Sequence, residues 1–236
     1  MTNSSGAPDI GPVIASINAG GVPTKTVLDV GIREKTPFLM QNFPHHRHYL
    51  FEPMREWHDA IKAAYAGLDY ELIPSACGSE DGRVEFRTAF MQAGFDKPSH
   101  GGMTGFIPES EVADRYEVEV VRLDSFIETR GLEGPFCLKV DVDGADLEVL
   151  KGAERTLESC NIVSLEMTRR NFAAIAGFMH DRGFYLHSLT GLEFGATPMD
   201  AEADRPATAL RFGDGVFLPM KWFGSPDLKP SLVPGR

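Results

Sequence analysis

Four carboxylates stand where short apolar runs of the sequence end, each in a position that suits the tip of a buried strand. Asp29 closes the run TVLDVG, Glu52 follows HYLF, Asp141 follows FCLKV, and Glu166 comes near the end of NIVSLEM. Parallel strands buried on both faces are almost wholly apolar, and their carboxyl ends meet at one edge of the sheet. One such carboxylate is explained by capping or surface charge, but four that converge indicate a polar cleft.

Carboxylates in a cleft suit two kinds of chemistry. A carboxylate beside an alcohol acts as a general base, and Asp141, with Asp143 second, is our candidate for that role. An acidic residue about 20 residues after the first strand-to-helix turn hydrogen-bonds ribose hydroxyls in nucleoside sites, and Glu52 stands there. The alternative is that Asp143 or Asp146 caps the following helix. We predict no metal site, although a magnesium ion held by Asp141 and Glu166 stays open.

The first turn narrows the choice of ligand. It reads Gly31-Ile32-Arg33-Glu34-Lys35 and holds one glycine, whereas a dinucleotide site needs G-x-G-x-x-G so that the backbone can approach the pyrophosphate. The sequence therefore favours a ligand with a ribose and no phosphate, such as S-adenosyl-L-methionine.

Strands and helices must alternate to bring these residues together, and the hydrophobic pattern predicts that they do. The predicted strands are 26–31, 48–53, 70–76, 81–87, 116–123, 136–140, 161–167, 184–189 and 213–219, and the predicted helices are 37–43, 54–67, 123–130, about 145 onward and 171–182. This order predicts an α/β fold with a mostly parallel twisted sheet and helices on both faces.

The same pattern divides the chain. Residues 1–20 are small and polar and predict a flexible segment, 21–222 form one domain, and 223–236 predict a loose tail. Residues 88–115, rich in Gly and Pro, form an insertion inside the domain that is long enough for a lid. His100 lies in it and is our third catalytic candidate.

Composition excludes some partners. The 236 residues carry a net charge of -11 and no basic run, which argues against nucleic acid and anionic membranes. No signal pattern or apolar run of membrane length appears, and three scattered cysteines suit a reduced compartment, so we expect a cytoplasmic protein. A homo-oligomer stays open.

Several stretches together resemble the FkbM-type methyltransferases, which are S-adenosylmethionine-dependent enzymes with a Rossmann-like class I methyltransferase fold that mostly methylate hydroxyl groups. The matching stretches are VLDVG (27–31), FEP (51–53), SACGSEDGRVEF (75–86), VVRLDSFIE (120–128), LKVDVDGADLEVLKGAE (138–154) and IVSLE (162–166).

By position, the resemblance implies that Asp29 and Gly31 line the methionine end of the cofactor and that Glu52 holds the ribose. It further implies that Ala76 and Cys77 lie near the adenine, and that Asp141, with Asp143, faces the methyl group and the acceptor.

The chain departs from the family twice. The family usually continues the first turn with a small residue, an Asn and another Gly, where this chain has Ile32-Arg33-Glu34-Lys35, so Arg33 or Lys35 is a candidate for binding the methionine carboxylate. It also usually has Glu at the position of Asp143.

The leading hypothesis is an O-methyltransferase that acts on a small-molecule or carbohydrate acceptor. The alternatives are a catalytically inactive cofactor-binding module of the same fold, because the first turn is unusual, and a nicotinamide oxidoreductase, which the missing glycines disfavour. Thermal stabilisation by S-adenosylhomocysteine would favour the methyltransferase or the inactive module, whereas stabilisation by NAD would favour the oxidoreductase.

Overall fold

The computed structural model describes residues 10–90, 97–98, 100–103, 107–196 and 208–223. Its elements in chain order are α1 (Ile10–Ala19), β1 (Thr26–Val30), α2 (Pro37–Asn42), β2 (Arg47–Phe51), η1 (Arg55–Trp57), α3 (His58–Ala64), β3 (Tyr70–Ile73), β4 (Ala76–Cys77), β5 (Gly82–Ala89), β6 (His100–Met103), η2 (Glu109–Glu111), β7 (Val112–Val121), α4 (Leu123–Arg130), β8 (Phe136–Val140), α5 (Asp146–Lys151), α6 (Glu154–Glu158), β9 (Cys160–Thr168), α7 (Phe172–Asp181), β10 (Phe184–Ala196), β11 (Thr208–Pro219) and η4 (Met220–Trp222).

The central sheet has seven strands in the order β10-β11-β9-β8-β1-β2-β3. Strands β3, β2, β1, β8 and β9 pair in parallel, whereas β11 pairs antiparallel with both β9 and β10. Every residue of β1 and β8 is buried, as the apolar runs of the sequence predict for central parallel strands. The chain leaves β1 toward β2 and β3 and later returns to β8 on the other side, so the strand order reverses between β1 and β8.

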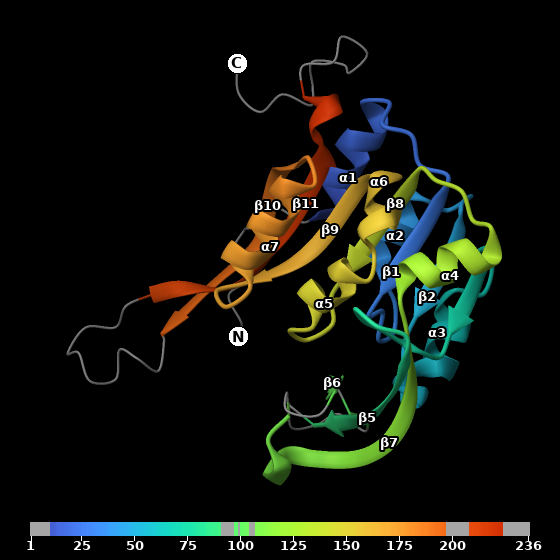
Figure 1. Ribbon diagram of the computed structural model, residues 1–236, viewed down its shortest axis with the longest axis vertical. Helices are drawn as coiled ribbons and strands as arrows, with labels where there is room; N and C mark the ends of the chain where they lie inside the picture. The colour runs from blue at the N-terminus through green and yellow to red at the C-terminus, as the bar shows by residue number, and fades with distance from the viewer. Residues whose placement is uncertain (1–9, 91–96, 99, 104–106, 197–207, 224–236) are drawn as a thin grey trace.

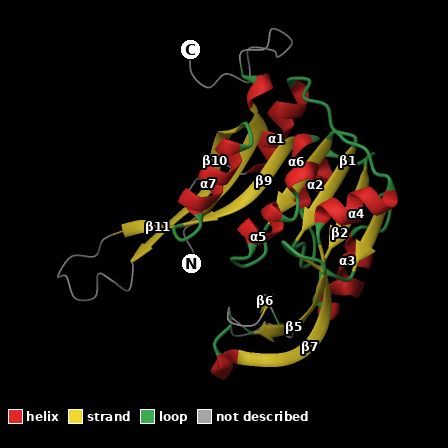
Figure 2. Cartoon of the chain, in the orientation of Figure 1, coloured by secondary structure: helices red, strands yellow, loops and turns green. Residues whose placement is uncertain are grey.

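Helices cover both faces of this sheet (Figures 1 and 2). Leu28 and Val30 of β1 belong to a core that includes side chains of α4, α5, α6 and α7, whereas Val27 faces the opposite core, which α1 and α2 complete. The alternation of neighbouring β1 residues between two cores is the period of two expected of a strand. The predicted Rossmann-like α/β architecture is therefore confirmed.

A second, smaller sheet with the order β4-β7-β5-β6 lies beyond the carboxyl ends of the central strands (Figure 1). The segment after β2 ties it down, because the Trp57 Nε1–H donates to the Pro98 carbonyl at 2.9 Å and Arg55 pairs with Asp114 at 2.8 Å. The insertion at 88–115, which we predict to be lid-like, is therefore not a plain loop. Its described parts include the end of β5, all of β6 and the start of β7, while 91–96, 99 and 104–106 lie outside the described residues.

The predicted flexible segment at 1–20 is wrong for its second half. Residues 10–19 form α1, and Ile10, Ile14 and Ile17 are buried in the core beneath it. These three isoleucines recur at helical spacing, which is a signal that the polar stretch before them obscures. The domain therefore begins by Ile10 instead of residue 21, and the predicted tail lies outside the described residues from 224 onward.

The remaining differences are local. The helix predicted from about 145 is two short helices, α5 and α6, separated at Gly152, where an added Cβ would lie 1.9 Å from the carbonyl oxygen of Gly78. The last two predicted strands are longer than expected, since β10 extends to Ala196 and β11 begins at Thr208. In the described part of the chain, no helix combines the length and the apolar character needed to cross a membrane.

Candidate active site

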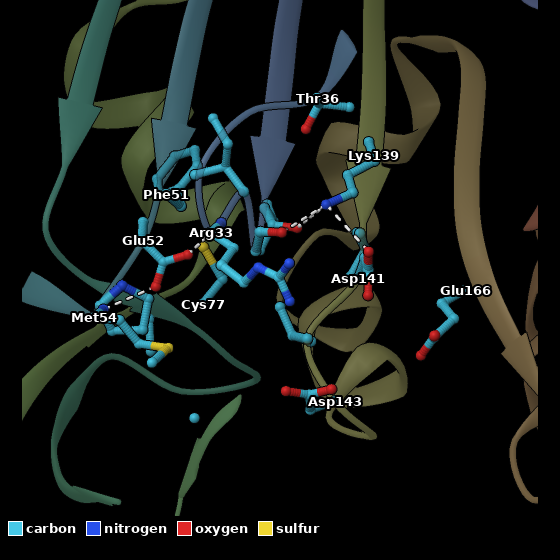
Figure 3. A pocket seen from close by; sticks show the side chains of 18 of the residues that line it. Arg33, Thr36, Phe51, Glu52, Met54, Cys77, Lys139, Asp141, Asp143 and Glu166 are labelled. Atoms are coloured by element: carbon cyan, nitrogen blue, oxygen red, sulfur yellow. Dashed lines mark hydrogen bonds and ion pairs between the residues drawn. The ribbon is translucent and has the colours of Figure 1, made fainter. Parts of the chain in front are cut away.

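A cavity of about 610 Å³ lies at the carboxyl ends of β1, β2, β8 and β9, where the strand order reverses (Figure 3). That position is where open α/β sheets bind ligands, and the volume falls in the range of roughly 300–1,000 Å³ typical of ligand pockets. The small sheet contributes to one wall through β5 and β6. Except for Asp29, every site residue predicted from the sequence lines this cavity: Gly31, Glu52, Ala76, Cys77, His100, Asp141 and Asp143.

Glu52 is held rigidly at the tip of β2. Its side chain is 3% exposed, and its two oxygens accept the backbone N–H groups of Arg33 at 2.6 Å and Met54 at 2.8 Å. Burial raises the pKa of Glu52 to about 7, although the two backbone N–H groups and the charge of Lys139 act in the opposite direction. Glu52 therefore presents a fixed carboxyl group, with lone pairs to spare, at the edge of the cavity.

The turn after β1 passes very close to β8. Gly31 adopts φ 77°, and a Cβ added to it would lie 1.9 Å from the carbonyl oxygen of Asp141, so only glycine fits. Arg33 follows with φ 54°, an unusual conformation for a residue with a side chain, and Glu52 stabilises it by accepting the Arg33 N–H. The guanidinium of Arg33 lies 5.5 Å from the centre of the Trp57 ring, and Arg33 also lines the cavity (Figure 3).

Asp29 is fully buried, does not line the cavity and lies next to Lys139. The two residues are register partners on β1 and β8, and Lys139 Nζ lies 3.5 Å from Asp29 Oδ1 and 3.5 Å from Asp141 Oδ2. Burial lowers the pKa of Lys139, but the charges of Asp141 and Asp29 outweigh it and hold that pKa above its ordinary value. Lys139 is therefore a buried cation between two carboxylates, a position that the apolar run around it does not predict.

Asp143 and His100 come together from two different sheets. Asp143 follows β8 in the left-handed region at φ 49°, and the Gly101 N–H of β6 is one of its hydrogen-bond partners. Burial raises the pKa of Asp143, the nearby His100 opposes that shift, and the charge of Asp141 reinforces it, leaving the pKa above its ordinary value.

The capping alternative for Asp143 is wrong. Helix α5 begins at Asp146, its N-cap is Ala145, and no side chain caps it. The Asp146 side chain closes the turn instead, by accepting the Val142 N–H at 3.2 Å. Asp143 therefore does not cap α5, and it lies on the cavity wall.

Glu166 of β9 and Asp214 of β11 form the far wall and are register partners. Burial raises the pKa of Glu166 to about 8, and repulsion by Asp141 and the other nearby carboxylates adds to the effect. At neutral pH, Glu166 is therefore mostly a neutral acid that can donate a hydrogen bond. Asp214 was missed, because its strand reads as the last one of the chain, with no sign that it returns beside β9.

Ala76 and Cys77 are 8% and 4% exposed and bring an apolar wall next to Glu52. Burial raises the pKa of the Cys77 thiol, so this cysteine stays protonated and acts as an apolar group. Among the residues that the structure describes, no group of three or more His, Cys, Asp or Glu side chains is arranged to hold a metal ion.

The solved structures that resemble this chain at low identity include several methyltransferases. The precorrin-6y C5,15-methyltransferase from Geobacter metallireducens GS-15 is 11% identical with a TM-score of 0.47, covering 89% of this chain and 87% of its own. The magnesium protoporphyrin IX methyltransferase (ChlM) from Synechocystis PCC 6803, solved with bound SAM, is 10% identical with a TM-score of 0.42, covering 89% of this chain and 77% of its own. The 23S rRNA methyltransferase ErmE is 10% identical with a TM-score of 0.39, covering 95% and 72%.

The sequence matches no curated protein. Residues 18–186, however, match the family model of the methyltransferase FkbM domain, and this match takes in β1, β2, β8 and β9 together with the loops that build the cavity. It spans more than half of the 236 residues, and the chain belongs to the FkbM methyltransferase domain family.

Proposed function

We propose that this protein transfers a methyl group from S-adenosylmethionine to a hydroxyl oxygen of a small-molecule or sugar-like acceptor. The observation that carries the proposal is Glu52, a buried carboxyl group fixed by two backbone N–H groups at the tip of β2. It faces a cavity that is large enough for a nucleoside and an acceptor, and the turn after β1 beside it holds the single glycine Gly31 instead of the three of a pyrophosphate cradle.

The cavity wall around Glu52 fits an adenosyl group. The carboxyl oxygens of Glu52 keep lone pairs that would accept two ribose hydroxyls. Ala76 and Cys77 supply the apolar surface that an adenine ring requires, and Gly31 leaves the start of the first turn without a side chain. Arg33 projects a cation into the same cavity, where it would pair with the methionine carboxylate.

S-adenosylmethionine, when bound, supplies a methyl group attached to a positively charged sulfur. The residues of this chain would align the acceptor, exclude water and take up the hydroxyl proton. Alignment alone can contribute up to roughly 7–11 kcal/mol toward the barrier. Asp141 is our candidate for the base, because it follows β8, lines the cavity and has a side chain that is 47% exposed.

The other polar groups of the wall suit a hydroxylated acceptor. Glu166, largely neutral at pH 7, would donate a hydrogen bond to one acceptor hydroxyl, and Asp214 would accept one from another. Asp143 and His100, on the side formed by β6, would contact the acceptor from the opposite direction. Carboxylates disfavour anionic acceptors, which supports a neutral polyol over a phosphorylated compound.

Titration calorimetry tests the cofactor first. We expect S-adenosylhomocysteine to bind the wild-type protein and NAD not to bind, and at 100 times the dissociation constant the ligand should add about 2.7 kcal/mol to the stability. Binding of NAD without binding of S-adenosylhomocysteine would refute the proposal.

A labelled-methyl assay then tests the acceptor class. Incubation with methyl-labelled S-adenosylmethionine and a panel of sugars, matched deoxy-sugars and amino-sugars should label the hydroxylated members, with an ether as product. Transfer to amines or to carbon, with none to hydroxyls, would show that the acceptor chemistry differs. Binding without transfer to any member of a wide panel would favour the inactive module.

A further inference from the structure

Lys139 is a charged residue inside an otherwise apolar strand, FCLKV, that is buried throughout. It is 7% exposed, and its Nζ donates to the Gly31 carbonyl at 2.6 Å and to the Val30 carbonyl at 3.4 Å. The same nitrogen lies 3.5 Å from carboxylate oxygens of Asp29 and of Asp141. A buried lysine is costly to a fold unless it is paired and hydrogen-bonded, so these contacts are required.

We propose that Lys139 is a positioning residue that holds the turn after β1 and the carboxylates of Asp29 and Asp141 in place for a positively charged cofactor. This inference rests on the proposed function, because it assigns to Lys139 the positioning of the site that would bind the sulfonium of S-adenosylmethionine. Lys139 itself lines the cavity, and in Figure 3 it lies above Asp141, between Glu52 on one side and Glu166 on the other.

The charges around Lys139 come from each strand beside it. Asp29 belongs to β1, Asp141 follows β8, Glu52 follows β2, and Glu166 of β9 is repelled by Asp141. An opposite charge within about 4–6 Å lowers the pKa of a carboxyl group by roughly 1–3 pH units. The Lys139 charge lowers the pKa of Glu52, so its removal would raise that pKa further.

The effect of Lys139 on the pKa of Glu52 has a functional consequence. A carboxylate that takes up a proton no longer attracts a sulfonium, so the affinity for S-adenosylmethionine should fall at low pH, with a midpoint that Lys139 keeps low. Loss of Lys139 should move that midpoint upward, because the Lys139 charge opposes the raised pKa of Glu52. A side chain that only filled space would change the affinity equally at every pH.

The hydrogen bonds of Lys139 link this electrostatic role to the backbone. The Gly31 carbonyl that accepts from Nζ belongs to the turn that packs against the Asp141 carbonyl, so one ammonium group holds both the turn after β1 and the carboxylate after β8. A glutamine at position 139 would keep one donor for Gly31 and would lack the charge, which allows the two contributions to be separated.

The experiment measures the dissociation constant of S-adenosylmethionine between pH 5 and pH 9 by calorimetry. The variants are Lys139→Met, Lys139→Gln and Lys139→Arg, with Lys151→Met as the matched control. Lys151 lies on α5, pairs with Glu148 at 2.6 Å and has a side chain that is 45% exposed, so its loss removes the same charge from the surface. Thermal unfolding establishes that each variant is folded.

We expect the acid midpoint of binding to rise by at least one pH unit in Lys139→Met and Lys139→Gln and to stay at the wild-type value in Lys151→Met. Lys139→Arg, which keeps the charge, should restore the wild-type midpoint. If Lys139→Met does not fold, Lys139→Gln carries the test, since it retains a donor for the turn.

Two results would overturn this inference and leave the proposed function intact. In the first, the wild type binds S-adenosylmethionine and the neutral variants have the same acid midpoint of binding as the wild type. In the second, the neutral variants lose the same factor in affinity at every pH. Wild-type protein that binds no S-adenosylmethionine at any pH would overturn the proposed function as well, so the two failures are distinguishable.

Discussion

Replacement of Glu52 by glutamine distinguishes the effect of this carboxyl group on protein stability from its effect on cofactor binding. Glu52 has a pKa of about 7 in the folded chain, against an ordinary value of 4.5, and burial is the main cause. The folded state therefore holds this proton more tightly than the unfolded state does. Because the pKa is raised on folding, the contribution of Glu52 to stability is fully present below pH 4.5 and is lost as the pH rises through 7.

The size of the effect follows from the two pKa values. Their difference corresponds to about 3 kcal/mol, which we take as an upper figure, lost from the wild type between about pH 4.5 and pH 8. Glutamine does not titrate, so Glu52→Gln escapes this loss. Its amide nitrogen, however, must face one of the two backbone N–H groups of Arg33 and Met54, which costs about 1–3 kcal/mol at every pH.

Urea unfolding of the ligand-free protein at pH 5, 6, 7 and 8 measures both contributions. At pH 5, we expect Glu52→Gln to be less stable than the wild type, and the gap should narrow by up to about 3 kcal/mol by pH 8. The same variant should bind S-adenosylhomocysteine at least tenfold more weakly at pH 8, which is about 1.4 kcal/mol, because the ribose loses a charged acceptor.

At pH 8, Glu52→Gln should thus have recovered stability relative to the wild type while it still binds S-adenosylhomocysteine more weakly. A generally damaged protein would lose stability and affinity together at all pH values. Parallel stability curves for the variant and the wild type would show that Glu52 does not titrate near neutrality, and an unchanged affinity in folded Glu52→Gln would show that this residue is only a structural clamp for the first turn.

Three further results are expected. Gly31→Ala should destabilise the protein by at least about 2 kcal/mol in urea unfolding, because its Cβ would collide with a backbone carbonyl, whereas Gly177→Ala, whose Cβ meets nothing within 4 Å, should be neutral or stabilising. Asp141→Asn should slow single-turnover methyl transfer by about 10²-fold or more, and Asp143→Asn by less than about tenfold; equal rates for the wild type and Asp141→Asn would remove Asp141 as the base. Because the folded-state pKa of Glu166 is raised to about 8, its contribution to stability is lost as the pH rises through 8, so Glu166→Gln should have a higher Tm than the wild type at pH 9, and a lower or equal Tm there would contradict the shift.

The central sheet was predictable because its strands carry strong signals. Burial on both faces leaves an apolar run with a polar tip, and Asp29, Glu52, Asp141 and Glu166 mark four neighbouring strands in that way. The parallel order then follows from the helices between the strands. The site could be located by the same logic, since the carboxyl edge and the order reversal do not depend on side-chain detail.

The parts that sequence reasoning missed depend on contacts between distant segments. The small sheet joins β5 to both β6 and β7, and β6 contains two adjacent glycines, Gly101 and Gly102, which carry no strand signal of their own. Their packing supplies the reason, since a Cβ on Gly101 would lie 2.6 Å from the Phe86 ring and 2.9 Å from the Met54 sulfur. Lys139 was missed for the opposite reason, because one lysine in an apolar strand is visible but its partners are not.

The first turn shows how a single glycine can serve where dinucleotide sites need three. Three glycines are needed where a backbone must approach a pyrophosphate, and this turn instead approaches the protein itself. Gly31 donates to the Phe51 carbonyl at 3.0 Å on the β2 side and accepts from Lys139 at 2.6 Å on the β8 side. Arg33 can then take a left-handed conformation because Glu52 accepts its N–H. The carboxyl group proposed to bind the ribose is thus the one that fixes the turn, and the lysine proposed to set the charge of the site fixes it from the other side. Because both neighbouring strands hold this turn, it can contain the large residues Ile32 and Arg33. Where the glycine-rich turn of a dinucleotide site presents only its backbone, this turn places the cation of Arg33 in the cavity.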